Sequence, residues 1–451
     1  MKIQKQVPLT EGPILKSLTG LAVPIMISSF LGTLYNITDM AWIGLLGSKA
    51  VAAVGVGGMY VWLSQGLASL ARMGGQVHVA QCLGRGDKEQ AHRYAKTAVQ
   101  LSILLGLAFA VVSLLFTDPL VAFFKLEGAK TILDAKIYMR ITCGLILFSF
   151  LNLTLTGLYT AQGDSKTPFV ANFIGLLINL LLDPLLILGV GPFPRIEVAG
   201  AAVATVSAQL VVMLVMMVGV FRSKKEENVL KGIRLFEPFS KEELGNICKI
   251  GGPTAIQGMV YCMISMVLTR MVAAFGAEAI ATQRVGGQIE SVSWNTADGF
   301  AAALNAFVGQ NYGAKKMDRV QKGYRISFWT VAIWGALIML AFIIFPGPIA
   351  GVFFHEEKAM EIAISYLIII GFSEAFMCVE LMTIGALSGL GKTKLCSVIS
   401  ITATSMRIPL AMVLSRTSLG LDGIWWALTL TSVAKGIIFY LTFRYQMHEK
   451  C

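Results

Sequence analysis

The chain has 451 residues, of which 55% are hydrophobic and only 14% are charged. A soluble protein of this length would carry roughly 25% charged residues, so the composition excludes a set of soluble domains and indicates a polytopic membrane protein. The net charge is +11, but the chain has too little polar surface to build a basic patch for nucleic acid. We expect the excess Lys and Arg in loops that face an anionic membrane surface.

A membrane-spanning helix needs about 20 mostly apolar residues. In chain order, stretches of this kind lie at 17–45, 51–82, 95–117, 134–160, 168–189, 199–221, 246–272, 279–310, 323–346, 361–388, 395–416 and 423–444. The polar segment 222–245 separates six of them from the other six. We therefore predict an all-α integral membrane protein with twelve transmembrane helices: an N-lobe over 1–221, a cytoplasmic linker over 222–245 and a C-lobe over 246–451.

The distribution of Lys and Arg orients the chain, because basic residues concentrate in cytoplasmic loops. Segments on the same side as the two termini carry most of these residues, including Arg85, Lys96, Arg319 and Lys392. The opposite segments carry few basic residues: Lys49, Lys125, Lys130, Lys136, Arg195, Lys358 and Arg416. We expect both termini in the cytoplasm and the protein in the cell (cytoplasmic or inner) membrane.

The second half of the chain repeats the first at an offset of 229 residues. Under this offset Pro24 matches Pro253, Gly57 matches Gly286 and Gln81 matches Gln310. Gly and Pro match best, as expected where the shared constraint is backbone geometry. Six spans in each half make the repeats parallel, with a pseudo-two-fold axis along the membrane normal. Two such lobes predict transport by alternating access, and nothing in the chain resembles a channel filter.

One group of polar residues in the first half shares a depth in the membrane. A charge near the bilayer centre costs roughly 2.5–3.5 kcal/mol, so each one needs a reason. Asp39, Asp183 and Thr205 each lie about six residues from the outer end of their helices, roughly 9 Å deep. Asn179 lies one turn before Asp183, on the same face. These residues predict an oxygen cage for a small cation, or a proton-binding pair. The alternative is that each carboxylate reaches outward to solvent or pairs with a helix neighbour.

The second half carries different polar residues. Leu268 stands at the position of Asp39, and Ile408 at the position of Asp183. Glu290 and Asp298 lie eight residues apart, near one helix face. Pairing of Glu290 with Arg284 or Arg407 would satisfy its charge structurally, and substrate contact is the alternative. Glu374 and Glu380 lie on nearly opposite faces of their helix. The residues that we predict to line a substrate cleft are Tyr35, Asn36, Gln257, Gln288, Glu290 and Asp298.

The chemistry of enzymes and of structural metal sites is not indicated. The chain has seven cysteines and four histidines, and their spacing matches neither a disulfide framework nor a zinc site. No Ser/His/Asp or Cys/His set stands out. We expect no catalytic residue and no cofactor besides a coupling ion.

Four motifs carry a family resemblance. They are Tyr35-Asn-Ile-Thr-Asp39 on the Pro24 helix, Asn179-Leu-Leu-Leu-Asp183-Pro184, Gly200-Ala-Ala-Val-Ala-Thr205, and Val308-Gly-Gln-Asn-Tyr-Gly-Ala-Lys315 with its weaker copy Ala80-Gln-Cys-Leu-Gly84. Together they resemble the multidrug and toxic compound extrusion (MATE) family of antiporters over essentially the whole chain, closest in the N-lobe to the DinF-like branch. The resemblance implies twelve helices in two lobes that exchange Na⁺ or H⁺ inward for amphipathic, mostly cationic compounds outward.

The resemblance also implies roles for particular residues. In the DinF-like branch the N-lobe cation site uses the residues that match Asp39, Asn179, Asp183 and Thr205, and all four are present. Other branches place acidic coupling residues on the seventh and tenth helices. Here the seventh has Gln257 but no acid. The two lobes complete one pathway in the lipid bilayer for a small-molecule substrate, so a monomer is sufficient.

Two other functions stay open. A flippase for lipid-linked oligosaccharide, from the wider superfamily that shares this duplication, would need cations for pyrophosphate. Arg270, Arg284, Arg407 and Lys435 would supply them, whereas the acidic N-lobe argues against this function. An integral-membrane enzyme would need a catalytic constellation on one aqueous side, and the sequence indicates none.

Overall fold

A computed structural model describes residues 7–189, 194–223, 228–235, 237–238, 240–354 and 356–448. All regular structure in these ranges is α-helical. Parts of the predicted linker, at 224–227, 236 and 239, lie outside the described residues. The first half contains α1 (Ile14–Gly44), α2 (Ser48–Arg85), α3 (Lys88–Leu115), α4 (Thr117–Ala122), α5 (Ala129–Gly144), α6 (Leu147–Ala161), α7 (Lys166–Ile187) and α8 (Glu197–Arg222).

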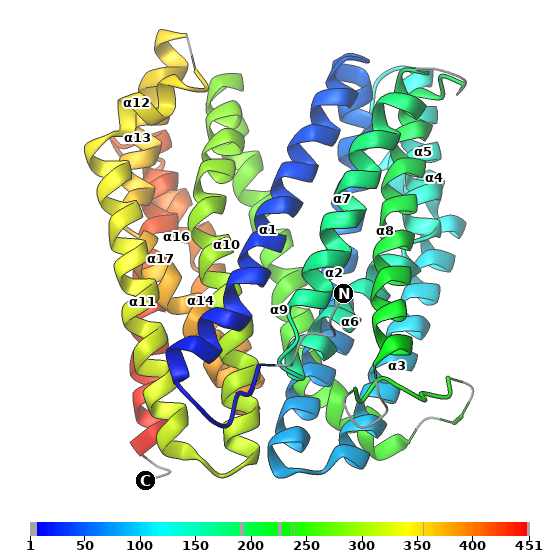
Figure 1. Cartoon of the computed structure of the whole chain (residues 1–451). Coiled ribbons are helices and arrows are strands. Elements are labelled where there is room, and N and C mark those ends of the chain that lie inside the picture. The colour runs from blue at the N-terminus through cyan, green and yellow to red at the C-terminus, as the bar shows by residue number, and fades with distance from the viewer. Residues whose placement is uncertain are drawn as a thin grey trace. The chain divides into compact units, whose positions relative to one another are not determined.

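The second half contains another series of helices (Figure 1). They are α9 (Lys241–Ala273), α10 (Ala277–Gly313), α11 (Met317–Ile344), α12 (Pro346–Gly351), α13 (Glu357–Gly371), α14 (Glu374–Gly389), α15 (Thr393–Ser405), α16 (Arg407–Leu414) and α17 (Leu421–His448). In the described ranges, nine helical stretches are long and apolar enough to cross a bilayer, one of them being α15 and α16 together. Two bent pairs, α5–α6 and α13–α14, supply one more each.

The remaining predicted span, 279–310, falls within α10. This helix has 37 residues, but it does not qualify as a span by hydropathy. Arg284, Glu290 and Asp298 interrupt its apolar sequence. With α10 included, the helices cover all twelve predicted stretches.

Two predicted spans are bent instead of continuous. The 134–160 stretch breaks between α5 and α6 with a bend of 43°, and the 361–388 stretch breaks between α13 and α14 with a bend of 51°. In both cases the helix before the break ends at a glycine, Gly144 or Gly371. Glycine weakens a helix because it loses more backbone entropy than other residues on ordering. The apolar pattern alone does not reveal the break, because it continues through both bends.

Contacts divide the chain into two units that do not coincide with the two halves of the sequence. The first contains Val7 and Ile27–Ala255, and the second contains Pro8–Met26 and the chain from Ile256 onward. The first part of α1 therefore belongs to the second unit, and the first part of α9 belongs to the first unit. The two crossing points are 229 residues apart and each follows a proline, Pro24 or Pro253, by the same distance. Proline removes a backbone hydrogen bond from the preceding turn, so both helices change unit next to a weakened turn.

The core of the first unit lies among α2, α3, α6 and α8. Close packing relies on small residues: a Cβ on Gly75 would lie 2.7 Å from the Cβ of Ala98. Val229 and Leu230 of the linker are buried in the same core, with Ile247 of α9. This part of the linker is therefore packed against the helices, although its composition is polar.

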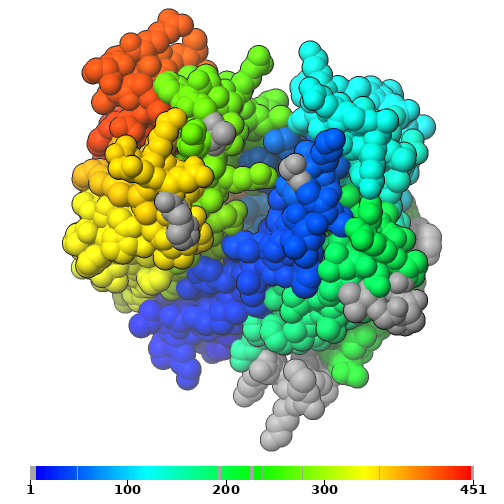
Figure 2. Space-filling view, turned by 90° about the horizontal axis from the view of Figure 1, so that it is seen from above, coloured from blue at the N-terminus to red at the C-terminus, as the bar shows by residue number. Residues whose placement is uncertain are grey.

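The core of the second unit surrounds Trp425, which is fully buried on α17. The ring of Tyr366 on α13 meets the Trp425 ring edge-on, with 4.8 Å between centroids. At one end of this unit the end of α9 lies beside the turn after α16, where Phe275 and Arg416 line a shallow hollow (Figure 2). Large apolar side chains such as Leu337 and Val413 are exposed on its helices, as expected where the solvent is lipid.

Candidate cation and substrate site

The polar residues predicted in the N-lobe lie on three helices of the first unit. Asp39 lies on α1, Asn179 and Asp183 lie on α7, and Thr205 lies on α8. Helices α7 and α8 run side by side (Figure 1). A glycine permits this approach, because a Cβ on Gly200 would lie only 2.6 Å from the backbone carbonyl of Leu186.

Direct contacts join these residues in pairs. The Tyr35 hydroxyl donates a hydrogen bond to Oγ1 of Thr205 at 2.9 Å, which links α1 to α8. Nδ2 of Asn179 donates to Oδ1 of Asp183 at 3.2 Å, within α7. Asp39 lies within electrostatic range of both Asp183 and Tyr35. The structure therefore brings Tyr35 together with the four predicted ligands, whereas the neighbouring Asn36 is exposed.

Several oxygen atoms of this group are buried without a partner. Asp183 is 0% exposed, Asn179 is 1% exposed and Asp39 is 7% exposed. Oδ1 of Asp39, Oδ1 of Asn179 and Oδ2 of Asp183 make no hydrogen bond in the structure. Buried polar atoms are almost always satisfied, because an unpaired one loses its hydration without compensation. A small cation or a proton would satisfy these oxygens.

The donor set narrows the kind of ion. In the ranges that the structure describes, no group of three or more His, Cys, Asp and Glu side chains is placed to hold a metal. The N-lobe group instead offers two carboxylates, an amide oxygen and a hydroxyl. Oxygen ligands of this kind suit a hard cation, and transition metals prefer imidazole or thiolate. The residues therefore fit Na⁺ or H⁺ as a coupling ion.

One residue of this site was not predicted from the sequence. Tyr138 on α5 is buried and lies within electrostatic range of Asp39 and Asp183. Its ring packs on Gly57, where a Cβ would lie 2.4 Å from Cδ1 of Tyr138. The repeat contains the missing signal. Tyr366 packs in the same way on Gly286, the repeat partner of Gly57, with a corresponding distance of 2.2 Å to Cε1.

Glu290 in the second unit is bonded to a tyrosine. The hydroxyl of Tyr366 donates to Oε1 of Glu290, and Arg407 lies within electrostatic range of the same carboxylate. Arg407 itself donates to Oγ1 of Thr431 at 3.0 Å and to Oγ of Ser432 at 2.9 Å. Of the two predicted partners, Arg407 is near Glu290 and Arg284 is exposed.

Two further acids of the second unit are buried with different surroundings. Glu380 forms an ion pair of 2.8 Å with Lys435, and both side chains are more than 90% buried. Glu374 is 1% exposed, and neither of its carboxyl oxygens has a hydrogen-bond partner. Glu374 lies within electrostatic range of Glu290. The second unit thus has its own buried polar cluster with a chemistry different from that of the N-lobe.

The other residues predicted to line a substrate cleft are not joined to this cluster by a direct contact that the structure shows. Gln257 on α9 accepts a hydrogen bond from Ser397 at 3.2 Å. Gln288 on α10 is exposed, and Asp298 on the same helix is half-buried and has an interaction partner. These three positions therefore remain expectations for substrate contact.

Comparison with known proteins identifies relatives over the full length. The MatE family model matches residues 24–185 and 253–413, so its two copies begin at Pro24 and Pro253. A probable multidrug resistance protein NorM from Thermotoga maritima is 30% identical over 93% of this chain and 90% of its own. An FAD transporter from Shewanella oneidensis is 26% identical over 96% of this chain and 95% of its own.

A solved structure shares the fold. The crystal structure of a MATE protein in the straight conformation covers 99% of both chains, with 24% identity and a TM-score of 0.90. The prediction of an all-helical membrane protein with twelve helices in two lobes is thereby confirmed.

Proposed function

The chain belongs to the MatE family of membrane transporters and is not an enzyme, and we propose that it is a secondary active exporter of amphipathic, mostly cationic compounds. Inward movement of Na⁺ or H⁺ drives the export. Asp39 and Asp183 bind the coupling ion, and Asn179 and Thr205 contribute neutral oxygens. The protein works as a monomer in the cell membrane with both termini in the cytoplasm.

The observation that carries this proposal is the set of unpaired, buried oxygens on Asp39, Asn179 and Asp183. A structural role would pair these atoms with donors, as Thr205 is paired with Tyr35. The second unit supports the contrast, because Glu380 is neutralised by Lys435 at 2.8 Å. Two nearby carboxylates without a cationic side chain in hydrogen-bond contact are suited to bind and release a mobile cation.

Coupling follows if the ion and the substrate favour different packings of the same helices. Ion binding joins α1, α7 and α8 through Asp39, Asp183 and Thr205. A cationic substrate is attracted by the same carboxylates and competes with the ion. Each ligand then changes the affinity of the other by the same factor, which is the reciprocity that antiport requires. Alternating access of the two lobes would convert this competition into exchange.

The proposal is tested by efflux of a fluorescent cationic dye from cells that express the protein, with and without an imposed Na⁺ gradient at fixed pH. We expect ion-driven efflux from the wild type and its loss in Asp39→Asn. Asp318→Asn is the matched control, because Asp318 is exposed on α11. Efflux that Na⁺ does not affect, but that Asp39→Asn abolishes, would assign the coupling to H⁺. An Asp39→Asn protein that still couples efflux to an ion gradient would contradict the site.

The rival substrates are anionic. The relative named as an FAD transporter makes FAD the natural second probe, and a lipid-linked pyrophosphate tests the flippase alternative. Transport of either one by a wild type that moves no cationic dye, despite normal membrane expression, would replace the proposed substrate class.

A further inference from the structure

The segment that precedes α1 is irregular but is held firmly by the second unit. Leu9 is only 1% exposed. Its carbonyl accepts a hydrogen bond from Nδ2 of Asn311, at the end of α10, at 3.0 Å. Nζ of Lys316 donates to the carbonyl of Thr10 at 3.0 Å. The start of the described chain is therefore bound by side chains that lie some three hundred residues away in sequence.

Arg319 on α11 adds the largest number of contacts. Its Nη1 donates to the carbonyl of Gly12 at 3.0 Å, and its Nη2 donates to the carbonyls of Leu9 and Glu11 at 3.3 and 3.2 Å. Its Nε donates to Oδ1 of Asn311 at 3.2 Å. Five donors in one rigid plane allow a guanidinium to bind several carbonyls at once, which a lysine cannot reproduce.

The attachment continues along the first half of α1. Leu18, Leu21 and Ala22 are fully buried. A Cβ on Gly299 of α10 would lie 2.4 Å from Cγ of Met26. Figure 1 shows the dark blue start of α1 beside the lower ends of α10 and α11. Met26 is also the last residue that belongs to the second unit. The same helix then continues to Tyr35 and Asp39 in the first unit.

We propose that Asn311, Lys316 and Arg319 form a permanent anchor that fixes the start of α1 to the second unit throughout transport. Through this anchor α1 becomes the rigid link between the cation site and the second unit. The three are positioning residues, because they touch neither the ion nor the substrate. The proposal rests on the proposed function and gives a role to the Val308–Lys315 motif, which the cation site does not use.

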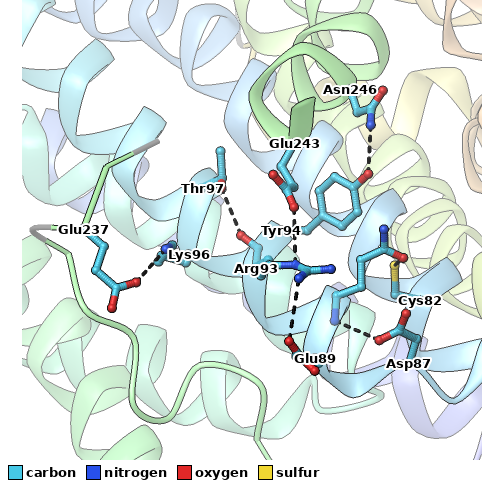
Figure 3. A network of polar contacts seen from close by, with 11 residues as sticks. Cys82, Asp87, Glu89, Arg93, Tyr94, Lys96, Thr97, Glu237, Glu243 and Asn246 are labelled. Atoms are coloured by element: carbon cyan, nitrogen blue, oxygen red, sulfur yellow. Dashed lines mark hydrogen bonds and ion pairs between the residues drawn. The ribbon is translucent and has the colours of Figure 1, made fainter. Parts of the chain in front are cut away.

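The first unit holds α9 in a corresponding manner, with different side chains (Figure 3). Nδ2 of Asn246 donates to the Tyr94 hydroxyl at 3.0 Å, and the carbonyl of Asn246 contacts Nε2 of His78 at 3.1 Å. Arg93 on α3 pairs with Glu243 at 3.4 Å. Each unit therefore retains the start of the first helix of the other half, so the anchoring is a property of the repeat and not an accident of one end.

The first test compares Arg319→Gln with Arg325→Gln, because Arg325 is exposed on the same helix. Loss of several hydrogen bonds from a charged donor should lower the maximal rate of dye efflux at least about fivefold, with the KM for dye unchanged. Dye binding to the purified protein should also be unchanged, and Arg319→Lys should restore only part of the rate. Equal efflux by Arg319→Gln and Arg325→Gln would overturn the anchor. A merely structural defect would lower dye binding as well, and that result would overturn it too.

The second test separates a permanent anchor from a latch that must open in each cycle. Thr10→Cys and Lys316→Cys are introduced after the native cysteines are replaced, and a short bifunctional thiol reagent joins them. Each single cysteine variant with the same reagent is the control. We expect the cross-linked protein to retain efflux, because the two positions never separate. Loss of efflux on cross-linking would overturn permanence. Failure of the proposed function would appear separately, as wild-type efflux that no ion gradient affects.

Discussion

At the scale of single residues, the two units solve the problem of buried charge in opposite ways. In the first unit Asp39 and Asp183 lie near each other without a cationic side chain in contact, and some of their oxygens are unpaired. In the second unit Glu380 is held by Lys435. A site that must bind and release an ion needs the first arrangement, and a structural ion pair has the second.

The hydroxyl of Thr205 provides the mildest test of the cation site. Thr205→Val keeps the shape of the side chain but removes the acceptor of the Tyr35 hydroxyl and one neutral oxygen. Loss of a hydrogen bond of this kind costs about 0.5–1.5 kcal/mol, so the apparent ion affinity should fall roughly two- to tenfold. The measurement is the dependence of efflux on ion concentration. Thr205→Ser should behave as the wild type, and an unchanged affinity in Thr205→Val would exclude the hydroxyl as a ligand.

The Glu380–Lys435 pair makes a prediction about stability. Lys435→Met leaves Glu380 buried without a partner, which should lower the free energy of unfolding by about 3–5 kcal/mol. The double variant Lys435→Met/Glu380→Gln should recover most of this loss, because no uncompensated charge remains. Thermal unfolding of the purified proteins measures both. A double variant as unstable as the single one would show that packing, and not charge, sets the cost.

At the scale of helices, glycines set how closely the site helices approach. Gly200 places α8 against the carbonyl of Leu186 on α7, and its repeat partner Gly423 places α17 against the carbonyl of Leu414 on α16, where a Cβ would lie 2.5 Å from the carbonyl oxygen. Backbone at this distance cannot give way as a flexible side chain can. The spacing of Asp183 and Thr205 therefore depends on a residue that is not itself a ligand.

Gly200→Ala should consequently disturb the site from outside it. The added methyl group overlaps the Leu186 carbonyl, and overpacking of this kind costs typically 1–3 kcal/mol. Gly58→Ala in α2 is the control, because nothing lies within 4 Å of the position of its Cβ. The control should be neutral or slightly stabilising, since Ala favours helix by about 1 kcal/mol over Gly. Thermal unfolding and ion-dependent efflux report the two effects, and equal behaviour of both variants would contradict close packing at Gly200.

At the scale of the whole molecule, the sequence predicted the spans and the depth of the N-lobe residues well. Asp39, Asp183 and Thr205 were placed at one depth by counting residues, and the structure places all three in one unit. Counting gives depth but not the direction around each helix, so it missed Tyr138, whose hydroxyl-bearing ring reaches the site from α5. The repeat of Tyr138 and Tyr366 on matched glycines would have revealed it.

Other features were beyond reach of the pattern for physical reasons. The bends after Gly144 and Gly371 lie within continuous apolar sequence, and a hydropathy pattern does not register them. The exchange of helix starts between the units depends on contacts such as Arg319 with the carbonyl of Glu11. Carbonyl acceptors are the same in every residue, so a side chain that binds them leaves no complementary residue type to find in the sequence.

The central claim is that the N-lobe carboxylates hold the ion that substrate displaces. The most direct measurement is the number of ions released when a cationic dye binds to the purified protein, followed as protons in weak buffer and as isotopic sodium in parallel. The account predicts release of one kind of ion from the wild type and from Glu374→Gln, and no release from Asp39→Asn. Undiminished release from Asp39→Asn, with loss in Glu374→Gln, would place the coupling ion in the second unit and contradict the account.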